Sequence, residues 1–342
     1  MNARERFLAV LDHKLPDRVP TFEILIHPNV VQALCPGCDY ADFVEAMDIE
    51  GVITGTPSSL YKKEVLDQER QILRDEWGVV RQLSREVVPM PLGGPISSRE
   101  DLRTYRAPDP NAPGRLEQLE RLLARFRGKR AVGVHLHDSF SYPTYLLGMD
   151  KLLMNLYLDP ELVRAVTALS VEHTLGMIER AVSMGADFIL FGDDYAATNA
   201  PMMSPKHFQE FFLPGLATVV QAAKSRGARV IKHTCGRITP ILDMIVATGI
   251  DALHPLDAAA GMDMAAVKAK YGDRIAVCGG INCGEVLSDW RPEQVEQEVI
   301  RRLRELAPGG GYILCSSNSI HSQVRPENYR AMIEALHRYG GY

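Results

Sequence analysis

Eight short apolar segments recur along the chain, and longer amphipathic stretches separate them. This alternation is typical of a parallel β-sheet whose neighbouring strands are joined by crossover helices. The predicted strands cover residues 19–26, 51–55, 131–137, 187–192, 229–234, 250–254, 275–280 and 312–317. Eight such units that close on themselves predict an α/β fold, a single (β/α)8 TIM barrel that spans residues 1–342.

Helix boundary signals between the strands agree with this pattern. Ser204 and Pro205 provide an N-cap and a first-turn proline for a helix that runs to about Ser225. Pro292 opens another helix that runs to about Leu306. The segments between the strands are therefore predicted to be crossover helices.

Residues 56–129 do not fit the repeat, because this stretch is longer than one β/α unit needs. It contains the segments ILRDEWGVVRQL, PMPLGGPISS and YRAPDPNAPGR, whose Pro and Gly clusters lie outside any periodic pattern. We predict an insertion between the second and third strands, formed by a small hairpin and a loop-rich cap over one mouth of the barrel.

The composition excludes several classes of partner. Hydrophobic residues make up 46% of the chain and charged residues 24%, as in an ordinary globular protein. The formal net charge is -5 and Lys and Arg are scattered, which argues against a nucleic acid partner. The charged, amphipathic N-terminus lacks a secretory apolar region, and no later run approaches the ~18 apolar residues of a membrane helix. We expect a cytoplasmic protein without a membrane partner.

Polar side chains gather where the predicted strands end, which is the catalytic face of such barrels. Along the first strand, alternation places Phe22 and Ile24 on one face, and Glu23 and His27 on the other. We expect the polar face to point into the barrel mouth. Glu23 is then a general acid or base, a substrate anchor or a metal ligand, or else it pairs with a cation of the barrel wall.

The third strand places His135 and His137 on one face, close to the same rim. They belong to a set of four histidines near predicted strand ends, His135, His137, His254 and His321. These histidines either bind substrate or are rim side chains with ordinary hydrogen bonds.

Four polar residues follow the fourth strand and are therefore expected at the rim: Asp193, Asp194, Tyr195 and Asn199. The adjacent carboxylates Asp193 and Asp194 point to opposite faces, so we expect one to serve the pocket and the other to cap a loop or a helix.

The fifth strand carries the most informative pair. His233 and Cys235 are two residues apart, so both side chains leave the same side of an extended backbone. Cys315 ends the eighth strand, which reaches the same rim in a closed barrel. One nitrogen and two sulfur ligands with an open fourth position are typical of a catalytic zinc site. The alternative is that the cysteines are buried and the histidine is only hydrogen-bonded.

The remaining cysteines are Cys35, Cys38, Cys278 and Cys283. Cys35-Pro-Gly-Cys38 is either a redox motif or half of a structural zinc site whose other half is Cys278 and Cys283. It lies in a loop region without a thioredoxin-like βαβ context, so we expect all four to be ordinary reduced thiols.

Four segments together resemble the uroporphyrinogen decarboxylase-like superfamily, over nearly the whole chain and in the expected order. They read RERFLAVLDHKLPDRVP, GDDYAATNAPMMSPKHFQEFFLPGL, GARVIKHTCGRITPILDMIVATGIDALHPLD and GYILCSSNSIHSQVRPENYRAMIEA. Members of this superfamily are (β/α)8 barrels, so the resemblance implies the same fold as the strand count.

Two activities share that fold. Uroporphyrinogen decarboxylases carry an arginine-rich signature, PVWxMRQAGR, where this chain reads RVPTFEILIHPN with Glu23 in place of a cation. Cobamide-dependent methyltransferases carry His-x-Cys and, about eighty residues later, a Cys that together bind zinc. His233, Cys235 and Cys315 stand in that relation. Some members carry Ser at the position of Cys315, in which case Glu23 or a pocket histidine would complete the zinc site.

The resemblance implies methyl transfer between a small molecule and the cobalt of a corrinoid carried on a separate protein. The residues with expected catalytic or substrate-binding roles are Glu23, Asp194, Tyr195, His135, His137, Asn199, His254 and His321. A rim this rich in histidine and acidic groups favours a polar methoxylated or N-methylated donor over a thiol acceptor.

Two alternatives remain open. The first is a cofactor-free decarboxylase acting on a tetrapyrrole or another carboxylated substrate, with Asp194 and Tyr195 as its candidate residues. The second is a non-catalytic barrel that binds a corrinoid protein or a tetrapyrrole. The sequence leaves open whether the protein forms a homodimer.

Overall fold

A computed structural model describes residues 1–55 and 62–342. Among these residues, seven parallel strands form one sheet in the order β1-β6-β7-β8-β9-β10-β11. Their bounds are β1 Gly51–Thr54, β6 Ala131–Leu136, β7 Phe188–Gly192, β8 Arg229–His233, β9 Ala252–His254, β10 Ala276–Ile281 and β11 Tyr312–Ser316. Each matches a strand expected from the sequence to within two residues at either end.

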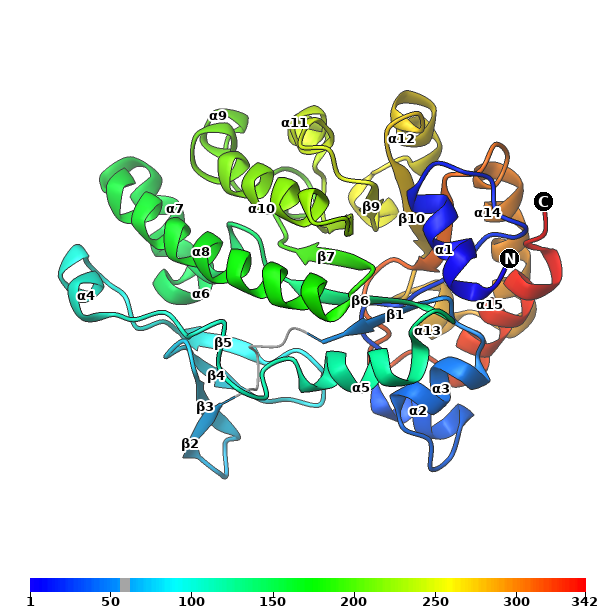
Figure 1. Cartoon of the computed structure of the whole chain (residues 1–342), viewed down its shortest axis with the longest axis horizontal. Coiled ribbons are helices and arrows are strands. Elements are labelled where there is room, and N and C mark those ends of the chain that lie inside the picture. The colour runs from blue at the N-terminus through cyan, green and yellow to red at the C-terminus, as the bar shows by residue number, and fades with distance from the viewer. Residues whose placement is uncertain (56–61) are drawn as a thin grey trace.

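Helices connect successive strands and surround the sheet (Figure 1). They are α1 (Ala3–Leu11), α2 (Pro28–Leu34), α3 (Tyr40–Ala46), α4 (Arg99–Thr104), α5 (Glu117–Phe126), α6 (Ser141–Leu147), α7 (Met149–Leu158), α8 (Pro160–Met184), α9 (Pro205–His207), α10 (Leu213–Ser225), α11 (Leu242–Ala247), α12 (Met264–Tyr271), α13 (Val286–Asp289), α14 (Pro292–Leu306) and α15 (Pro326–Tyr339). No helix within the described ranges is both long enough and apolar enough to span a bilayer.

The segment expected as the first strand, residues 19–26, is not a regular strand. It forms isolated parallel bridges, from Thr21 to Leu314 of β11 and from Phe22 to Gly51 of β1. The chain bends at Ile24, which interrupts the pairing before a ladder can form. The segment nevertheless contacts both edge strands of the sheet.

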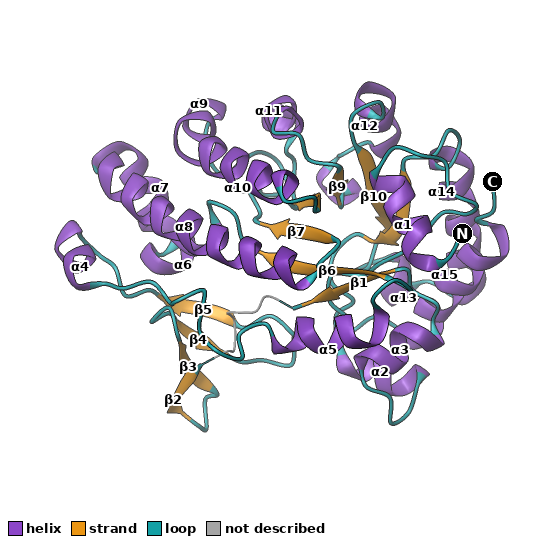
Figure 2. Cartoon of the chain, in the orientation of Figure 1, coloured by secondary structure: helices purple, strands orange, loops and turns teal. Residues whose placement is uncertain are grey.

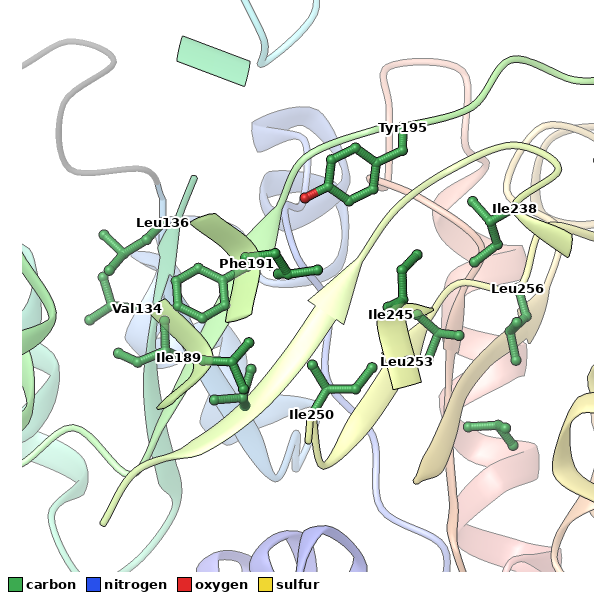
Figure 3. Packing of buried hydrophobic residues seen from close by; sticks show 14 of the residues in the cluster. Val134, Leu136, Ile189, Phe191, Tyr195, Ile238, Ile245, Ile250, Leu253 and Leu256 are labelled. Atoms are coloured by element: carbon green, nitrogen blue, oxygen red, sulfur yellow. The ribbon is translucent and has the colours of Figure 1, made fainter. Parts of the chain in front are cut away.

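The two faces of the sheet carry different apolar clusters. Val134 of β6, Ile189 of β7 and Leu253 of β9 belong to the large cluster packed under the helices (Figure 3). The alternate residues of the strands, including Leu190 and Ile231, form a second cluster with α1. Period-2 alternation therefore assigns each strand residue either to the helix-covered face or to the inner face.

A separate antiparallel sheet lies between β1 and β6 in the sequence (Figure 2). Its strands are β2 (Lys63–Asp67), β3 (Ile72–Asp75), β4 (Val80–Gln82) and β5 (Met90–Gly93). The expected small hairpin is thus a four-stranded sheet in this structure. The expected start of the insertion, at residue 56, lies outside the described residues.

The helix expected from residue 204 to 225 is interrupted by one wide turn. The chain forms α9, then a π-helix over Phe208–Phe212, then α10. Pro214 has no N–H with which to continue an α-helical ladder, which accounts for a local change of hydrogen bonding here. The helix expected from Pro292 to Leu306 is α14 and is confirmed.

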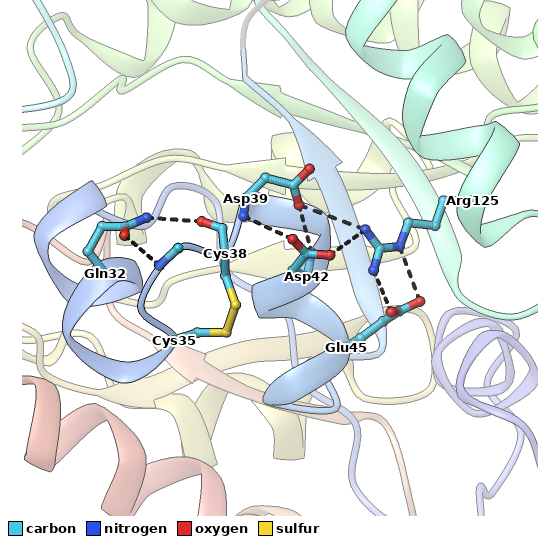
Figure 4. Close-up of a disulfide and its surroundings, with 8 residues drawn as sticks. Gln32, Cys35, Cys38, Asp39, Asp42, Glu45 and Arg125 are labelled. Carbon is cyan, nitrogen blue, oxygen red and sulfur yellow. Dashed lines mark hydrogen bonds and ion pairs between the residues drawn. A yellow bond between two sulfur atoms is a disulfide. The ribbon is translucent and has the colours of Figure 1, made fainter.

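The expectation that Cys35 and Cys38 are reduced thiols is wrong, because a disulfide joins them (Figure 4). The turn between α2 and α3 brings their Cα atoms to 5.4 Å, within the range for a disulfide. The Gln32 side chain holds this turn by accepting from the Gly37 N–H and donating to the Cys38 carbonyl, at 3.0 and 2.9 Å. Cys278 and Cys283 are free thiols.

Candidate functional site

Asp194, His233 and Cys235 come together at the carboxyl ends of β7 and β8. One ligand atom from each residue lies within 4.8 Å of the other two. His233 Nε2 is 3.5 Å from Cys235 Sγ and 3.3 Å from Asp194 Oδ1. Within residues 1–55 and 62–342, no other group of three His, Cys, Asp or Glu side chains is this close.

These separations fit a tetrahedral zinc ion. Zinc lies about 2.1 Å from nitrogen and oxygen ligands and about 2.3 Å from sulfur. Tetrahedral angles then place a nitrogen and an oxygen about 3.4 Å apart, and a nitrogen and a sulfur about 3.6 Å apart. His233 Nε2 is at nearly these distances from Asp194 and Cys235, and the Asp194 and Cys235 ligand atoms lie within 4.8 Å of each other.

A hydrogen-bond chain sets the tautomer of His233. His254 Nε2 lies 3.0 Å from the Ser316 carbonyl oxygen, which only accepts, so Nε2 carries the hydrogen. Burial holds the pKa of His254 well below its usual range, so the ring is neutral and its Nδ1 accepts. His233 Nδ1, 2.7 Å away, is therefore the donor. A neutral His233 presents an unprotonated Nε2 to Cys235 and Asp194.

The charges of Asp194, His233 and Cys235 favour binding of a cation between them. The Asp194 side chain is about half exposed, at 49%. Burial raises the pKa of the Asp194 carboxyl, but the Cys235 backbone N–H at 2.7 Å and the hydrogen bond and positive charge of His233 in its protonated form hold that pKa well below its usual range. Burial and the Asp194 carboxylate raise the pKa of Cys235 far above its usual value. A bound cation would reverse that effect and stabilise the thiolate.

Cys315 is not part of this group. It is fully buried within β11 and belongs to the inner apolar cluster, together with Cys278 and Ile313. Burial raises the pKa of its thiol well above the usual value. In this structure Asp194, and not Cys315, is the third potential ligand.

Glu23 lies on the opposite side of the sheet from the expected one. Phe22 and Ile24 belong to the inner cluster, so the apolar face of this segment points inward and the predicted orientation is wrong. Glu23 accepts hydrogen bonds from the backbone and hydroxyl of Ser316, at 3.1 and 2.5 Å, and is 2% exposed. Burial raises its pKa to about 8. These contacts give Glu23 a buried role next to β11 and no contact with the candidate metal centre.

The two adjacent aspartates have separate roles, as expected. Asp193 is buried and accepts from the backbone N–H groups of Asp138, Phe140 and Ser141 at 2.8–3.1 Å, which caps the start of α6. It also accepts from His137 Nδ1 at 2.8 Å. Asp194 is the residue that faces the candidate metal centre.

Tyr195 belongs to a buried polar network below the rim. Its hydroxyl donates to Asp138, and Lys232 Nζ donates to the same carboxylate at 2.7 Å and to the Asp193 carbonyl at 2.9 Å. Tyr195, Asp138 and Lys232 are all fully buried. Sequence reasoning missed Lys232 as a functional residue, although a lysine inside the apolar run VIKH signals a buried charge pair.

A cavity of about 500 Å³ lies between the antiparallel sheet and the end of β6, and none of the three potential metal ligands lines it. His135 and His137 line it, together with Trp77, Arg81 and residues 114–119. Gly192 separates His135 from His233, and a Cβ at Gly192 would lie 2.1 Å from His135 Nε2. The missing side chain lets the His135 ring, which lines the cavity, lie over Gly192, the β7 neighbour of His233.

The remaining expected site residues lie elsewhere. Asn199 is exposed in the loop after β7. His321 accepts from the Gln323 N–H at 3.2 Å and stands next to Ser322, which bonds to Glu86. His135 and His137 line the cavity and His254 is hydrogen-bonded to His233, whereas Asn199 and His321 belong neither to the metal group nor to the cavity lining among the described residues.

The chain resembles known proteins in sequence and in fold. The family model described as uroporphyrinogen decarboxylase (URO-D) matches residues 82–339. The uroporphyrinogen decarboxylase of Pseudoalteromonas atlantica is 23% identical over 263 residues, which cover 72% of this chain and 70% of that protein. The protein of the same name from Psychromonas ingrahamii is 24% identical over 257 residues, which cover 71% of this chain and 69% of that protein.

Among solved structures, a methyltransferase from Methanosarcina mazei aligns over 99% of both chains, with a TM-score of 0.78 and 17% sequence identity. At this identity the likeness shows that the two chains share a fold.

Proposed function

The chain belongs to the uroporphyrinogen decarboxylase family, and we propose that it is a zinc-dependent methyltransferase acting with a corrinoid protein. The methyl group would move between a small substrate and the cobalt of the corrinoid. The single observation that carries the proposal is the grouping of Asp194, His233 and Cys235, in which His233 Nε2 lies at tetrahedral-zinc distances from the other two ligand atoms.

The site fits a catalytic zinc more closely than a structural one. Three protein ligands leave a fourth position for a substrate, and the 49% exposure of Asp194 leaves that side of the group accessible. When bound, zinc supplies a Lewis acid that polarises a donor oxygen or holds an acceptor thiol as thiolate. The cobalt of a corrinoid, if bound over this site, would supply the methyl-carrying centre.

The residues of this chain hold and orient the reacting groups. His254 donates to the Ser316 carbonyl and accepts from His233, which keeps the His233 ring in one orientation. Asn318 Nδ2 donates to Cys235 Sγ at 3.2 Å, which stabilises negative charge on the sulfur. His135 lines the cavity, where the small substrate would bind, and its ring lies over Gly192, the β7 neighbour of His233.

We further propose that the chain forms a closed eight-stranded barrel. Residues 21 and 22 pair with β11 and β1, the two edges of the seven-stranded sheet, and so occupy the eighth position. A corrinoid protein would dock over the carboxyl ends of the strands, where the metal centre lies. The segment 56–129 would be an insertion at that end, because Trp77 and Arg81 line the cavity.

Decarboxylation is the second candidate, since the sequence relatives above are named uroporphyrinogen decarboxylase. The cavity argues against a substrate with many carboxylates. Arg81 is paired with Asp75 at 2.6 Å, and Arg115 with Glu76 at 2.5 Å. These guanidinium groups already have carboxylate partners, so a polyanion would compete with them.

The test is methyl transfer to free reduced cobalamin from a panel of methoxylated and N-methylated compounds. We expect formation of methylcobalamin that stops on chelation and returns with zinc. Carbon dioxide release from uroporphyrinogen by the exhaustively chelated protein would overturn the proposal in favour of a decarboxylase.

A further inference from the structure

The Ser316 hydroxyl, at the end of β11, contacts two further oxygen atoms. They are Glu23 Oε2, at 2.5 Å, and the carbonyl oxygen of Asn318. A hydroxyl has one hydrogen, and a carbonyl oxygen only accepts. If Glu23 is ionised, both neighbours of the hydroxyl are acceptors and compete for that hydrogen. If Glu23 is protonated, it donates to Ser316 Oγ, and the hydroxyl donates to Asn318. The hydrogen bond between Glu23 and this hydroxyl can thus run in either direction, but only the protonated carboxyl group provides a hydrogen for both contacts.

The surroundings of Glu23 also favour the protonated form. The side chain is 2% exposed, and burial raises its pKa to about 8 against the opposing hydrogen bonds from Ser316. The neighbouring edge strand β1 carries no ionisable side chain. Four ionisable groups interact electrostatically with Glu23 from other elements, and burial raises the pKa of each above its usual value: Tyr40 of α3, Tyr329 of α15, Cys315 of β11 and Cys283 after β10. These four groups are neutral near pH 8, so Glu23 is the one whose charge changes there.

The backbone of Ser316 connects Glu23 to the first potential metal ligand. The Ser316 N–H donates to Glu23 Oε1 at 3.1 Å, and the Ser316 carbonyl accepts from His254 Nε2 at 3.0 Å. His254 Nδ1 in turn accepts from His233 Nδ1 at 2.7 Å. Because each contact fixes the next, the position of the Ser316 backbone determines how the His233 ring is held.

The hydroxyl of Ser316 connects Glu23 to a second potential ligand. It contacts the carbonyl oxygen of Asn318, an exposed residue after β11, and so anchors the Asn318 backbone. The Asn318 side chain donates from Nδ2 to Cys235 Sγ at 3.2 Å. An ionised Glu23 would compete for the Ser316 hydrogen that Asn318 needs, and the support of Cys235 would weaken.

We propose that the protonated Glu23 carboxyl group is a positioning residue for the metal centre, acting through Ser316 and Asn318. Glu23 does not touch the metal ion. Its ionisation releases one proton to solvent, breaks the O–H···O bond from Glu23 to Ser316 and redirects the Ser316 hydrogen from Asn318 to the carboxylate. The inference rests on the proposed function in taking the bound ion as zinc.

The first experiment measures zinc affinity between pH 6 and 9, by competition with a chromogenic chelator. Glu23→Gln copies the protonated acid, because the amide donates to Ser316 Oγ and accepts from the Ser316 N–H. We expect this variant to match the parent protein at pH 7 and to bind zinc about five-fold more tightly than the parent at pH 9. The titration of the ligands themselves cancels in this ratio. Glu23→Ala should bind about ten-fold more weakly than the parent at pH 7.

A pair of hydroxyl variants tests the route through Asn318. Ser316→Ala should lower zinc affinity about ten-fold, because the Asn318 carbonyl loses its donor. The matched control is Thr248→Val, since the buried Thr248 hydroxyl donates to the Ile245 carbonyl at the end of α11 and should leave the affinity unchanged. Two results would overturn the inference. One is a ratio of Glu23→Gln to parent affinity that stays constant with pH, and the other is parent-like affinity in Ser316→Ala.

The second experiment needs no metal, so it separates this inference from the proposed function. Burial keeps His254 neutral between pH 7 and 9, and its ring nitrogens report on the Ser316 contact. With 15N-labelled histidine in the metal-free protein, we expect the His254 shifts to change with a midpoint near pH 8 in the parent and to stay constant in Glu23→Gln. The same change in both proteins, or in neither, would overturn the inference even if zinc binds. A Glu23-dependent change in a protein that binds no zinc would refute the zinc site and leave the role of Glu23 standing.

Discussion

β8 and β11 both carry a cysteine near the carboxyl end, but only one of these cysteines reaches the candidate metal centre. Cys235 follows the last residue of β8 by two positions and is partly exposed beside His233 and Asp194. Cys315 lies inside β11 and is fully buried in the inner apolar cluster. Cys235 lies two residues beyond the end of its strand and Cys315 lies one residue before the end of its strand. This difference of three positions makes the first a potential ligand and the second a core residue.

The largest expected effect separates these two cysteines directly. Cys235→Ser removes one of three ligands, and we expect zinc affinity to fall by at least about a hundred-fold. Cys315→Ala should keep the affinity of the parent protein, since its side chain lies in the core. Zinc competition with a chromogenic chelator measures both. Equal loss of zinc in the two variants would contradict the difference between β8 and β11.

The second prediction concerns the fully buried pair of Lys232 and Asp138 below the metal centre. Lys232→Met leaves the Asp138 carboxylate without its ammonium partner, so we expect a loss of about 3–5 kcal/mol in the free energy of unfolding. Urea denaturation measures it. The matched control is Lys270→Met, because Lys270 pairs with Asp243 on the surface and the midpoint should not move. An unchanged midpoint in Lys232→Met would show that this network is not structural.

The third prediction uses Glu23, which is buried next to Ser316 of β11. Its pKa in the folded protein is raised to about 8, so folding takes up a proton above the unfolded value of about 4.5. The associated stability is complete below about pH 4.5 and is lost as the pH rises towards 8. We expect Glu23→Gln to flatten the pH dependence of stability by on the order of 2 kcal/mol between pH 5 and 7.

The control for Glu23 is the exposed Glu293, since Glu293→Gln should retain the pH dependence of the parent protein. Thermal unfolding at several pH values provides the measurement. A Glu23→Gln protein with the same pH dependence as the parent would show that this carboxyl group is ionised in the folded state.

The smallest effect concerns the orientation of His233. His254→Phe removes the hydrogen-bond acceptor of His233 Nδ1 while preserving a buried ring, so we expect zinc affinity to fall by about ten-fold. His173→Phe removes a histidine that bonds to the Pro108 carbonyl, away from the metal centre, and should leave the affinity unchanged. An unaltered affinity in His254→Phe would mean that His233 needs no such support.

Much of the fold was predictable because its signals are local. Seven apolar segments form the parallel strands, and the same-face relation of His233 and Cys235 follows from alternation along one strand. The first expected strand failed because a bend at Ile24 reduces it to isolated bridges. Its inner face is the apolar one, so the sequence pattern assigned Glu23 to the wrong side.

The third potential ligand was harder to predict because it depends on contacts between strands. Asp194 was expected at the rim, but nothing along the chain indicates that its oxygen lies 3.3 Å from His233 Nε2. Cys315 matches a spacing motif, while its depth depends on where β11 ends. The Pro-Gly turn between Cys35 and Cys38 was visible, yet the bond between them depends on the conformation of that turn.

The most direct measurement is X-ray absorption at the zinc edge of the zinc-loaded protein. The arrangement of Asp194, His233 and Cys235 predicts one sulfur at about 2.3 Å, with the remaining ligands nitrogen or oxygen at about 2.0–2.2 Å. Two sulfur ligands would bring a second cysteine, Cys315 or Cys283, into the site and contradict Asp194 as the third ligand. Absence of sulfur would remove Cys235 as well and refute the metal centre proposed here.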